Sequence, residues 1–261
     1  MMLSGKTALV TGSTSGIGLG IARKLAAQKA NIVFNGFGEA SEIDKIRKSV
    51  EAEFGIETYY HGADLSKTAE IEKLHEELSS QFKSIDILVN NAGIQHTSPV
   101  ENFPADKWDQ IIAINLSSAF HLCRLTLPKM KEKNWGRIIN IASVHGLVAS
   151  VHKAAYVAAK HGIVGLTKVV ALECAELNIT CNAICPGWVL TPLVEKQIEA
   201  LAQKQNLSYE KASEELLLEK QPSKRFSGID QLGDLAVFLC SDAASNMTGT
   251  SIPVDGGWVA R

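Results

Sequence analysis

The chain has 261 residues, of which 46% are hydrophobic and 21% are charged, and its formal net charge is -2. A chain of this size can bury roughly three quarters of its surface, and the near-neutral charge gives no reason to expect nucleic acid or an anionic membrane as partner. No apolar run approaches the roughly 18 residues that span a bilayer.

The first residues and the cysteines indicate a cytoplasmic protein. Residues 1–6 lead directly into an apolar run and lack the charged-then-apolar build of a signal peptide. The five cysteines are odd in number and lie in apolar surroundings, as small buried thiols do in a reducing compartment. Cys181 and Cys185 have no second pair beside them, so we expect no metal site.

Short apolar runs alternate with helical patterns along the whole chain. Strands are predicted at 7–11, 31–34, 57–61, 86–90, 137–142, 179–184 and 251–254, and helices at 17–28, 43–54, 69–82, 106–130, 153–175 and 231–240. Continuous apolar strands that alternate with helices predict an α/β fold whose parallel sheet is covered on both faces. Because no repeat or linker interrupts the pattern, residues 1–261 are expected to form a single domain.

A glycine-rich turn lies between the first strand and the first helix. It reads Gly12-x-x-x-Gly16-x-Gly18, which differs from the G-x-G-x-x-G fingerprint. Glycines allow close backbone approach, and a helix N-terminus offers amide donors to a pyrophosphate. The turn therefore predicts a dinucleotide site.

The end of the second strand bears on the choice of dinucleotide. Residues 35–38 contain neither an acid for a ribose hydroxyl nor an arginine for a 2'-phosphate. With no cation to pair a phosphate, NAD is favoured over NADP. Phe37 either packs against the adenosine or belongs to the core.

Two features of the middle of the chain fit a ligand crevice. Residues 90–93 (Asn-Asn-Ala-Gly) close the fourth strand with side chains that permit close approach. Asn115 interrupts an otherwise apolar helix, where a buried amide must be satisfied. Either a site role or a local structural hydrogen bond would explain it.

Ser143, Tyr156 and Lys160 form the candidate catalytic group. Tyr156 and Lys160 are one helical turn apart, and Ser143 ends a strand shortly before them. A nearby ammonium lowers the pKa of a tyrosine and lets it exchange a proton with a hydroxyl or carbonyl. The same spacing also occurs by chance on many helices.

Polar side chains flank these positions. Gln95, His96, His145 and Lys153 bring amide, imidazole and ammonium donors toward the reacting centre, which predicts a small carboxylate as substrate. Trp188 and Trp258 would confine the pocket to a short aliphatic molecule, or else are core or interface aromatics.

Taken together, these motifs resemble the short-chain dehydrogenase/reductase family over the whole chain. The resemblance implies a Rossmann-type, doubly wound sheet of seven parallel strands and hydride transfer between a nicotinamide and a hydroxyl or carbonyl. It implies that Tyr156 is the acid/base, that Lys160 holds the nicotinamide ribose, that Ser143 binds the substrate oxygen, and that Asn115 supports a water path. It places the cofactor against residues that include Gly12, Thr14, Ser15, Gly16, Ile17, Gly18, Phe37, Ala63, Asp64, Leu65, Asn91, Ala92, Gly93, Leu116, Pro186, Gly187, Val189 and Thr191.

Within the family, the chain is similar to a bacterial subgroup that acts on a short 3-hydroxy acid. That resemblance assigns the substrate carboxylate to Gln95, His145, Lys153 and Gln197, and the methyl end to Trp188 and Trp258. It makes residues 191–226, with helices predicted near 193–204 and 208–220, a substrate lid; the alternative is a surface excursion. It also implies a homotetramer that pairs the helices 106–130 and 153–175.

Two other functions remain open at this stage. One is an NADPH-dependent reductase of 3-oxoacyl thioesters, against which the missing basic residues and the donor cluster argue. The other is a catalytically silent dinucleotide-binding protein. The intact tyrosine–lysine pair argues against it, because binding alone does not require that pair.

Overall fold

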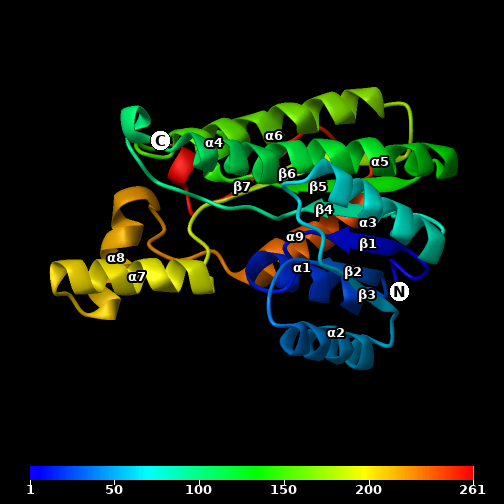
Figure 1. Ribbon diagram of the computed structural model, residues 1–261, viewed down its shortest axis with the longest axis horizontal. Helices are drawn as coiled ribbons and strands as arrows, with labels where there is room; N and C mark the ends of the chain where they lie inside the picture. The colour runs from blue at the N-terminus through cyan, green and yellow to red at the C-terminus, as the bar shows by residue number, and fades with distance from the viewer. Residues whose placement is uncertain (261) are drawn as a thin grey trace.

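The computed structural model describes residues 1–260, apart from the side chains of Leu193 and Glu219. Seven parallel strands form one sheet in the order β3-β2-β1-β4-β5-β6-β7 (Figure 1). Their bounds are β1 Thr7–Val10, β2 Asn31–Asn35, β3 Thr58–His61, β4 Ile87–Asn90, β5 Gly136–Ile141, β6 Ile179–Pro186 and β7 Ser251–Val254. The order reverses between β1 and β4, and ligands of such sheets bind at the carboxyl ends of the strands beside this reversal.

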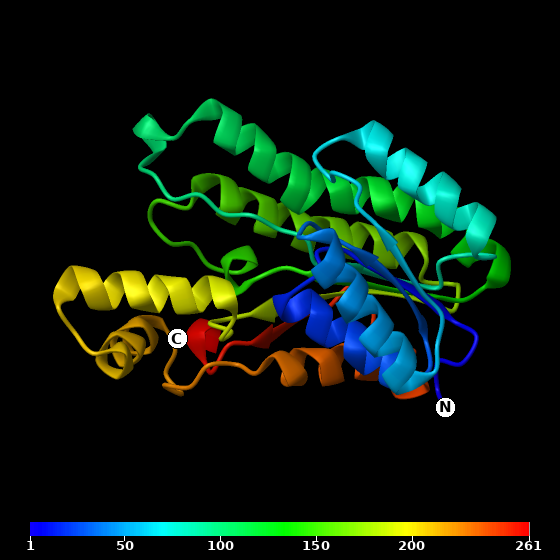
Figure 2. The ribbon, with the colours of Figure 1, turned by 60° about the horizontal axis from the view of Figure 1, so that its bottom comes forward.

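Helices cover both faces of the sheet (Figures 1 and 2). One face carries α1 (Gly16–Ala27), α2 (Ala40–Phe54) and α9 (Ile229–Cys240), and the other carries α3 (Thr68–Gln81), α5 (Ser118–Lys133) and α6 (Ala154–Glu173). The predicted doubly wound α/β fold is therefore confirmed.

Alternation along each strand divides the core into two layers. On β1, Ala8 and Val10 enter the layer under α1 and α9, whereas Leu9 enters the layer under α3 and α5. Successive side chains of a strand point to opposite faces, so a strand buried on both sides must be apolar throughout. This is why continuous apolar runs located the strands to within two or three residues.

The predicted helix at 106–130 is interrupted. It consists of α4 (Ala105–Ile112), a π-helical turn (Ala113–Ser117) and α5. Asn115 lies in this turn, and its amide leaves the helix to bond the backbone of Ile94, at 2.9 Å in both directions. A single π turn of this kind commonly re-aims a side chain at a functional site.

Two long helices are apolar enough to resemble membrane spans. Ala105–Lys133 and Ala154–Glu173 meet the length and composition of a span, so the expectation that no segment approaches this was wrong. Here, however, they pack on the sheet, where Leu122, Val170 and Ala171 belong to the core.

The segment after β6 forms two helices that project from the sheet (Figure 2). They are α7 (Pro192–Gln205) and α8 (Tyr209–Lys220), close to the predicted ranges. Thr191 and Ser208 accept hydrogen bonds at their N-termini from Val194 (3.4 Å) and Lys211 (3.3 Å). A small core built on Val194, Ile198 and Ala212 joins them to Trp188, so this segment is packed against the crevice.

Candidate active site

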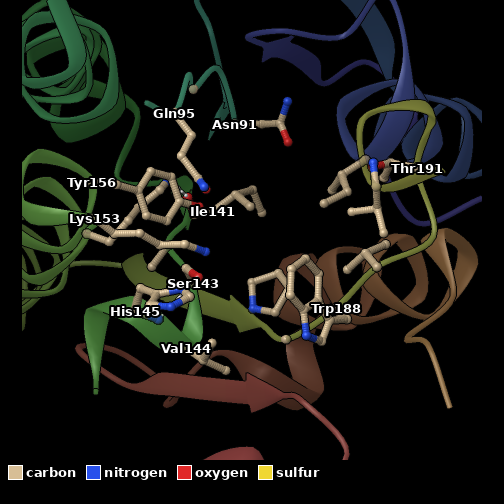
Figure 3. A pocket seen from close by; sticks show the side chains of 18 of the residues that line it. Asn91, Gln95, Ile141, Ser143, Val144, His145, Lys153, Tyr156, Trp188 and Thr191 are labelled. Carbon is tan, nitrogen blue, oxygen red and sulfur yellow. Dashed lines mark hydrogen bonds between the residues drawn. The ribbon is translucent and has the colours of Figure 1, made fainter. Parts of the chain in front are cut away.

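A cavity of about 220 Å³ lies at the carboxyl ends of the central strands (Figure 3). Figure 3 shows Gln95, Lys153, Tyr156, Ser143 and His145 gathered on one side and Trp188 with Thr191 on the other. Of the residues named from the sequence, the cavity is lined by Ile17, Asn91, Gly93, Gln95, Ser143, His145, Lys153, Tyr156, Lys160, Pro186, Gly187, Trp188, Val189, Thr191, Gln197 and Trp258.

The candidate catalytic group converges as the spacing predicted. Ser143 follows β5 and caps a short 3-10 turn (Val144–Gly146), while Tyr156 and Lys160 lie on α6. The Ser143 hydroxyl acts on the Tyr156 hydroxyl, whose pKa it lowers. The Lys160 ammonium donates to the Ile141 carbonyl at 2.7 Å and lies 5.6 Å from the centre of the Tyr156 ring.

The electrostatics of this group differ from the expectation. Burial raises the pKa of Tyr156, which the hydrogen bond with Ser143 only partly offsets, and burial lowers the pKa of Lys160 to about 8. Lys160 is not among the causes of this shift, and its lowering of the pKa of Tyr156 stays a prediction. The interior disfavours both charged forms, so ionising Tyr156 requires further stabilisation from a bound ligand.

His145 is a neutral member of the donor set. Burial, and then the charges of Lys153 and Lys220, lower its pKa to about 4. Its ring lies between two hydroxyls, with Nδ1 3.3 Å from Ser143 Oγ and Nε2 2.9 Å from Ser150 Oγ. At pH 7 it exchanges hydrogen bonds, and the positive charge at this end of the cavity comes from Lys153.

The two tryptophans form a wall of the cavity. Ring centres are 6.1 Å apart for Trp188 and Trp258, and 5.5 Å apart for Trp258 and His145. The Lys153 ammonium lies 5.6 Å from the Trp188 ring. The buried indole nitrogen of Trp188 has no hydrogen-bond partner among the described residues, so a ligand or water must satisfy it.

Besides Asn115 in the π turn and Gly18 in the glycine-rich turn, two residues named from the sequence line neither the catalytic nor the cofactor cavity. His96 packs edge-on against Phe103, with ring centres 5.4 Å apart, and lines a larger neighbouring cavity instead. Leu116 lines none of the cavities found in the described chain; it packs against Gly162 and the small core around Ala119. His96 was named because it follows Gln95, and Leu116 was named from the family resemblance. Neither side chain lines the catalytic cavity or the cofactor cavity.

A second cavity, of about 380 Å³, adjoins the first. It lies beside the glycine-rich turn between β1 and α1. Of the predicted cofactor residues, it is lined by Gly12, Thr14, Ser15, Gly16, Ile17, Phe37, Ala63, Asp64, Leu65, Asn91, Ala92, Gly93 and Thr191. Phe37 is 68% exposed, so the alternative that it belongs to the core is wrong. Gly18 lies behind the turn, where a Cβ would clash with the Gly12 carbonyl oxygen.

The glycine turn fits a pyrophosphate. Gly12 and Gly16 have φ values of 60° and 54°, which other residues rarely adopt. Ser15 occupies the N-cap of α1 without using its side chain as a cap, so the first amides of the helix face the cavity. The described residues can therefore hold a dinucleotide here.

Several residues of the site had no clear signal in the sequence. Thr11 Oγ1 accepts from the backbone of Asn91 (2.9 Å) and Ala92 (3.0 Å), which braces the turn against β4. Ile94 and Ile114 line the cofactor cavity. Their only sequence signal was adjacency to Gly93 and Asn115.

Comparison with known proteins agrees with this geometry. The family described as "Enoyl-(Acyl carrier protein) reductase" matches residues 12–259. A D-beta-hydroxybutyrate dehydrogenase of Cupriavidus necator is 63% identical over 261 residues, covering 100% of both chains. One of Rhizobium meliloti is 53% identical over 256 residues, covering 98% of this chain and 99% of its own.

Among solved structures, an L-sorbose reductase from Gluconobacter frateurii, complexed with NADPH and L-sorbose, has a TM-score of 0.94 at 30% identity. The match covers 100% of this chain and 98% of the reductase. The whole chain therefore shares its fold with a dinucleotide-dependent reductase.

Proposed function

We propose, from the premise that this chain belongs to the short-chain dehydrogenase/reductase family, that it catalyses the reversible NAD-dependent oxidation of D-3-hydroxybutyrate to acetoacetate. One observation carries the proposal. A single small cavity holds both the Ser143–Tyr156 pair and the four donors Gln95, His145, Lys153 and Gln197. A hydroxy acid whose carboxylate lies a few atoms from its hydroxyl can contact both sets of residues at once.

The size of this cavity supports a short substrate. At about 220 Å³ it is large enough for a four-carbon acid. Lys153 and the amides bind the carboxylate, whereas Trp188 and Trp258 pack against the methyl end. The D enantiomer is proposed because both dehydrogenases compared above carry that designation.

The chain's own residues perform the proton transfer. Ser143 holds the C3 oxygen, and Tyr156 accepts the hydroxyl proton as C3 gives up its hydride and becomes a carbonyl carbon. A bound nicotinamide supplies the hydride acceptor and, when oxidised, a positive charge. Lys160 sets the position of the helix turn that carries Tyr156 by its bond to the Ile141 carbonyl.

NAD is proposed as the dinucleotide. The cofactor cavity is lined at the end of β2 by Asn35, Gly36 and Phe37, none of which is cationic. A 2'-phosphate placed there would lose its hydration without gaining an ion pair. The exposed ring of Phe37 offers a surface on which an adenine can stack.

The assembly and location follow from the same reasoning. We place this single-domain protein in the cytoplasm, since all five cysteines are free and buried. A homotetramer is proposed because α5 and α6 expose Phe120, Val169 and Leu172 on the side away from the sheet.

The test is absorbance of NADH with purified enzyme, NAD and each enantiomer of 3-hydroxybutyrate, with NADP in parallel. Rapid reduction with the D enantiomer and NAD alone is the expected result. Consumption of NADPH with a 3-oxoacyl thioester, and none with the hydroxy acid, would replace the proposal by the reductase function. Binding of NAD without turnover of any hydroxy acid would indicate a silent binding protein.

A further inference from the structure

A larger cavity, of about 1070 Å³, adjoins the catalytic one. The two share part of their lining, including Gln95, Lys153, Trp188, Gln197 and Trp258. The larger cavity runs between α7, α8 and the loop after β4, and it has nearly five times the volume of the catalytic cavity. This arrangement makes it the approach to the catalytic cavity.

The charge of this approach has one sign. Among the described residues that line either cavity there is no aspartate or glutamate, whereas Lys153 and Lys220 are both present. The chain as a whole carries a net charge of -2, so the positive sign is local. A cleft lined by one sign of charge raises the local concentration of the opposite ion.

Lys220 is held at this approach by the residue that follows it. Lys220 ends α8, and the next side chain, Gln221, is only 1% exposed. Its Oε1 accepts from the Trp188 backbone N–H at 2.9 Å, and its amide group donates to the Arg225 carbonyl. The end of α8 is thereby fixed to the tryptophan wall of the catalytic cavity.

The field of Lys220 reaches the catalytic cavity. After burial and Lys153, its charge is the next cause that lowers the pKa of His145. A cation that disfavours a second positive charge at His145 favours a negative charge in the same place.

We propose that Lys220 is a specificity-determining residue, which attracts the carboxylate of the substrate into the approach before the lid positions Gln197. This inference rests on the proposed function, because it concerns the anion that the catalytic cavity receives. Lys220 assists entry, whereas Lys153 and its neighbours bind the carboxylate after arrival. The consequence is a role in KM and in salt dependence, and none in the chemical step.

The experiment compares Lys220→Gln with Lys211→Gln, which removes the same charge from an exposed position on the same helix. Steady-state kinetics with D-3-hydroxybutyrate and NAD are measured at low and high salt. Lys220→Gln is expected to raise the KM for the hydroxy acid by roughly fivefold to tenfold at low salt, with kcat and the KM for NAD within about twofold. The difference should shrink strongly near 0.5 M salt because screening removes the attraction.

Two further variants of Lys220 separate its charge from its aliphatic stem. Lys220→Arg should keep the wild-type KM, and Lys220→Met, which keeps the aliphatic stem, should behave as Lys220→Gln does. Equal KM values for Lys220→Gln and Lys211→Gln would overturn the inference, as would a parallel loss of kcat and thermal stability. If the wild type does not oxidise the hydroxy acid at all, the proposed function fails instead.

Discussion

At the scale of single residues, burial dominates the chemistry of this site. Lys160 is buried and Tyr156 is half-buried, and desolvation moves their pKa values in opposite directions, upward for the phenol and downward for the ammonium. A catalytic acid/base works best when its pKa lies near the working pH. The phenol on its own is therefore a proton donor, and its use as a base depends on what binds beside it.

Replacement of Tyr156 tests its role directly. Tyr156→Phe removes the hydroxyl that exchanges the proton but keeps the ring in its packed position. We expect kcat to fall by roughly 10² to 10⁴, with the dissociation constant for NADH retained. Tyr209→Phe, at an exposed position at the start of α8, is the matched control. Near-normal turnover by Tyr156→Phe would exclude Tyr156 as the acid/base.

His145 gives a prediction about stability and pH. Its folded-state pKa is about 4, below the ordinary value of 6.5, so the unfolded chain binds its proton more tightly between these values. Stability contributed by this residue is therefore present above pH 6.5 and is lost as the pH falls toward 4, by at most about 3 kcal/mol.

Urea unfolding at pH 7.5 and pH 4.5 measures this loss. His145→Gln should lose clearly less stability over that interval than the wild type. His152→Asn, which changes an exposed histidine, should follow the wild type. Identical losses in all three proteins would show that His145 is not a source of the acid sensitivity.

At the scale of elements, the π turn connects one helix to the substrate loop. Asn115 satisfies both the N–H and the C=O of Ile94, the residue before Gln95. The turn thus fixes the loop that carries Gln95 into the cavity. Of the two alternatives for Asn115, the structural hydrogen bond is confirmed, whereas the site role stays a prediction.

Asn115→Ala should destabilise the fold and weaken substrate binding together. Two backbone groups of Ile94 lose their partners, which costs roughly 1–3 kcal/mol if water does not replace them. The freed loop should raise the KM for the hydroxy acid more than that for NAD. Asn102→Ala, at an exposed position, is the control for the loss of an amide. Unchanged unfolding energy and KM would show that the clamp is dispensable.

At the scale of the whole molecule, one side of the protein remains apolar. Val169 is 52% exposed and Leu172 is 78% exposed on α6, beyond the face that packs on the sheet. These helices have the length and hydropathy of membrane spans, although less than half of each apolar window is buried. The proposed association of subunits through α5 and α6 would cover these exposed side chains.

Val169→Glu should therefore dissociate the assembly. A charge buried between two helices costs more than the contact gains unless it is paired. Light scattering is expected to give four times the 28.1 kDa of one chain for the wild type and a smaller mass for the variant. Val100→Glu alters an exposed valine away from these helices and should leave the mass unchanged. A wild-type protein that is monomeric at micromolar concentration would contradict the tetramer.

The sequence by itself determined the strands, the doubly wound sheet and the closeness of Ser143, Tyr156 and Lys160. These follow from local rules: a strand buried on both faces is apolar throughout, and residues four apart share a helix face. Only the tertiary structure decided the directions of the pKa changes, the partner of Asn115, the exposure of Phe37 and the place of Lys220. Those properties depend on which distant segments surround a side chain, and desolvation and long-range contacts do not exist until the chain has folded.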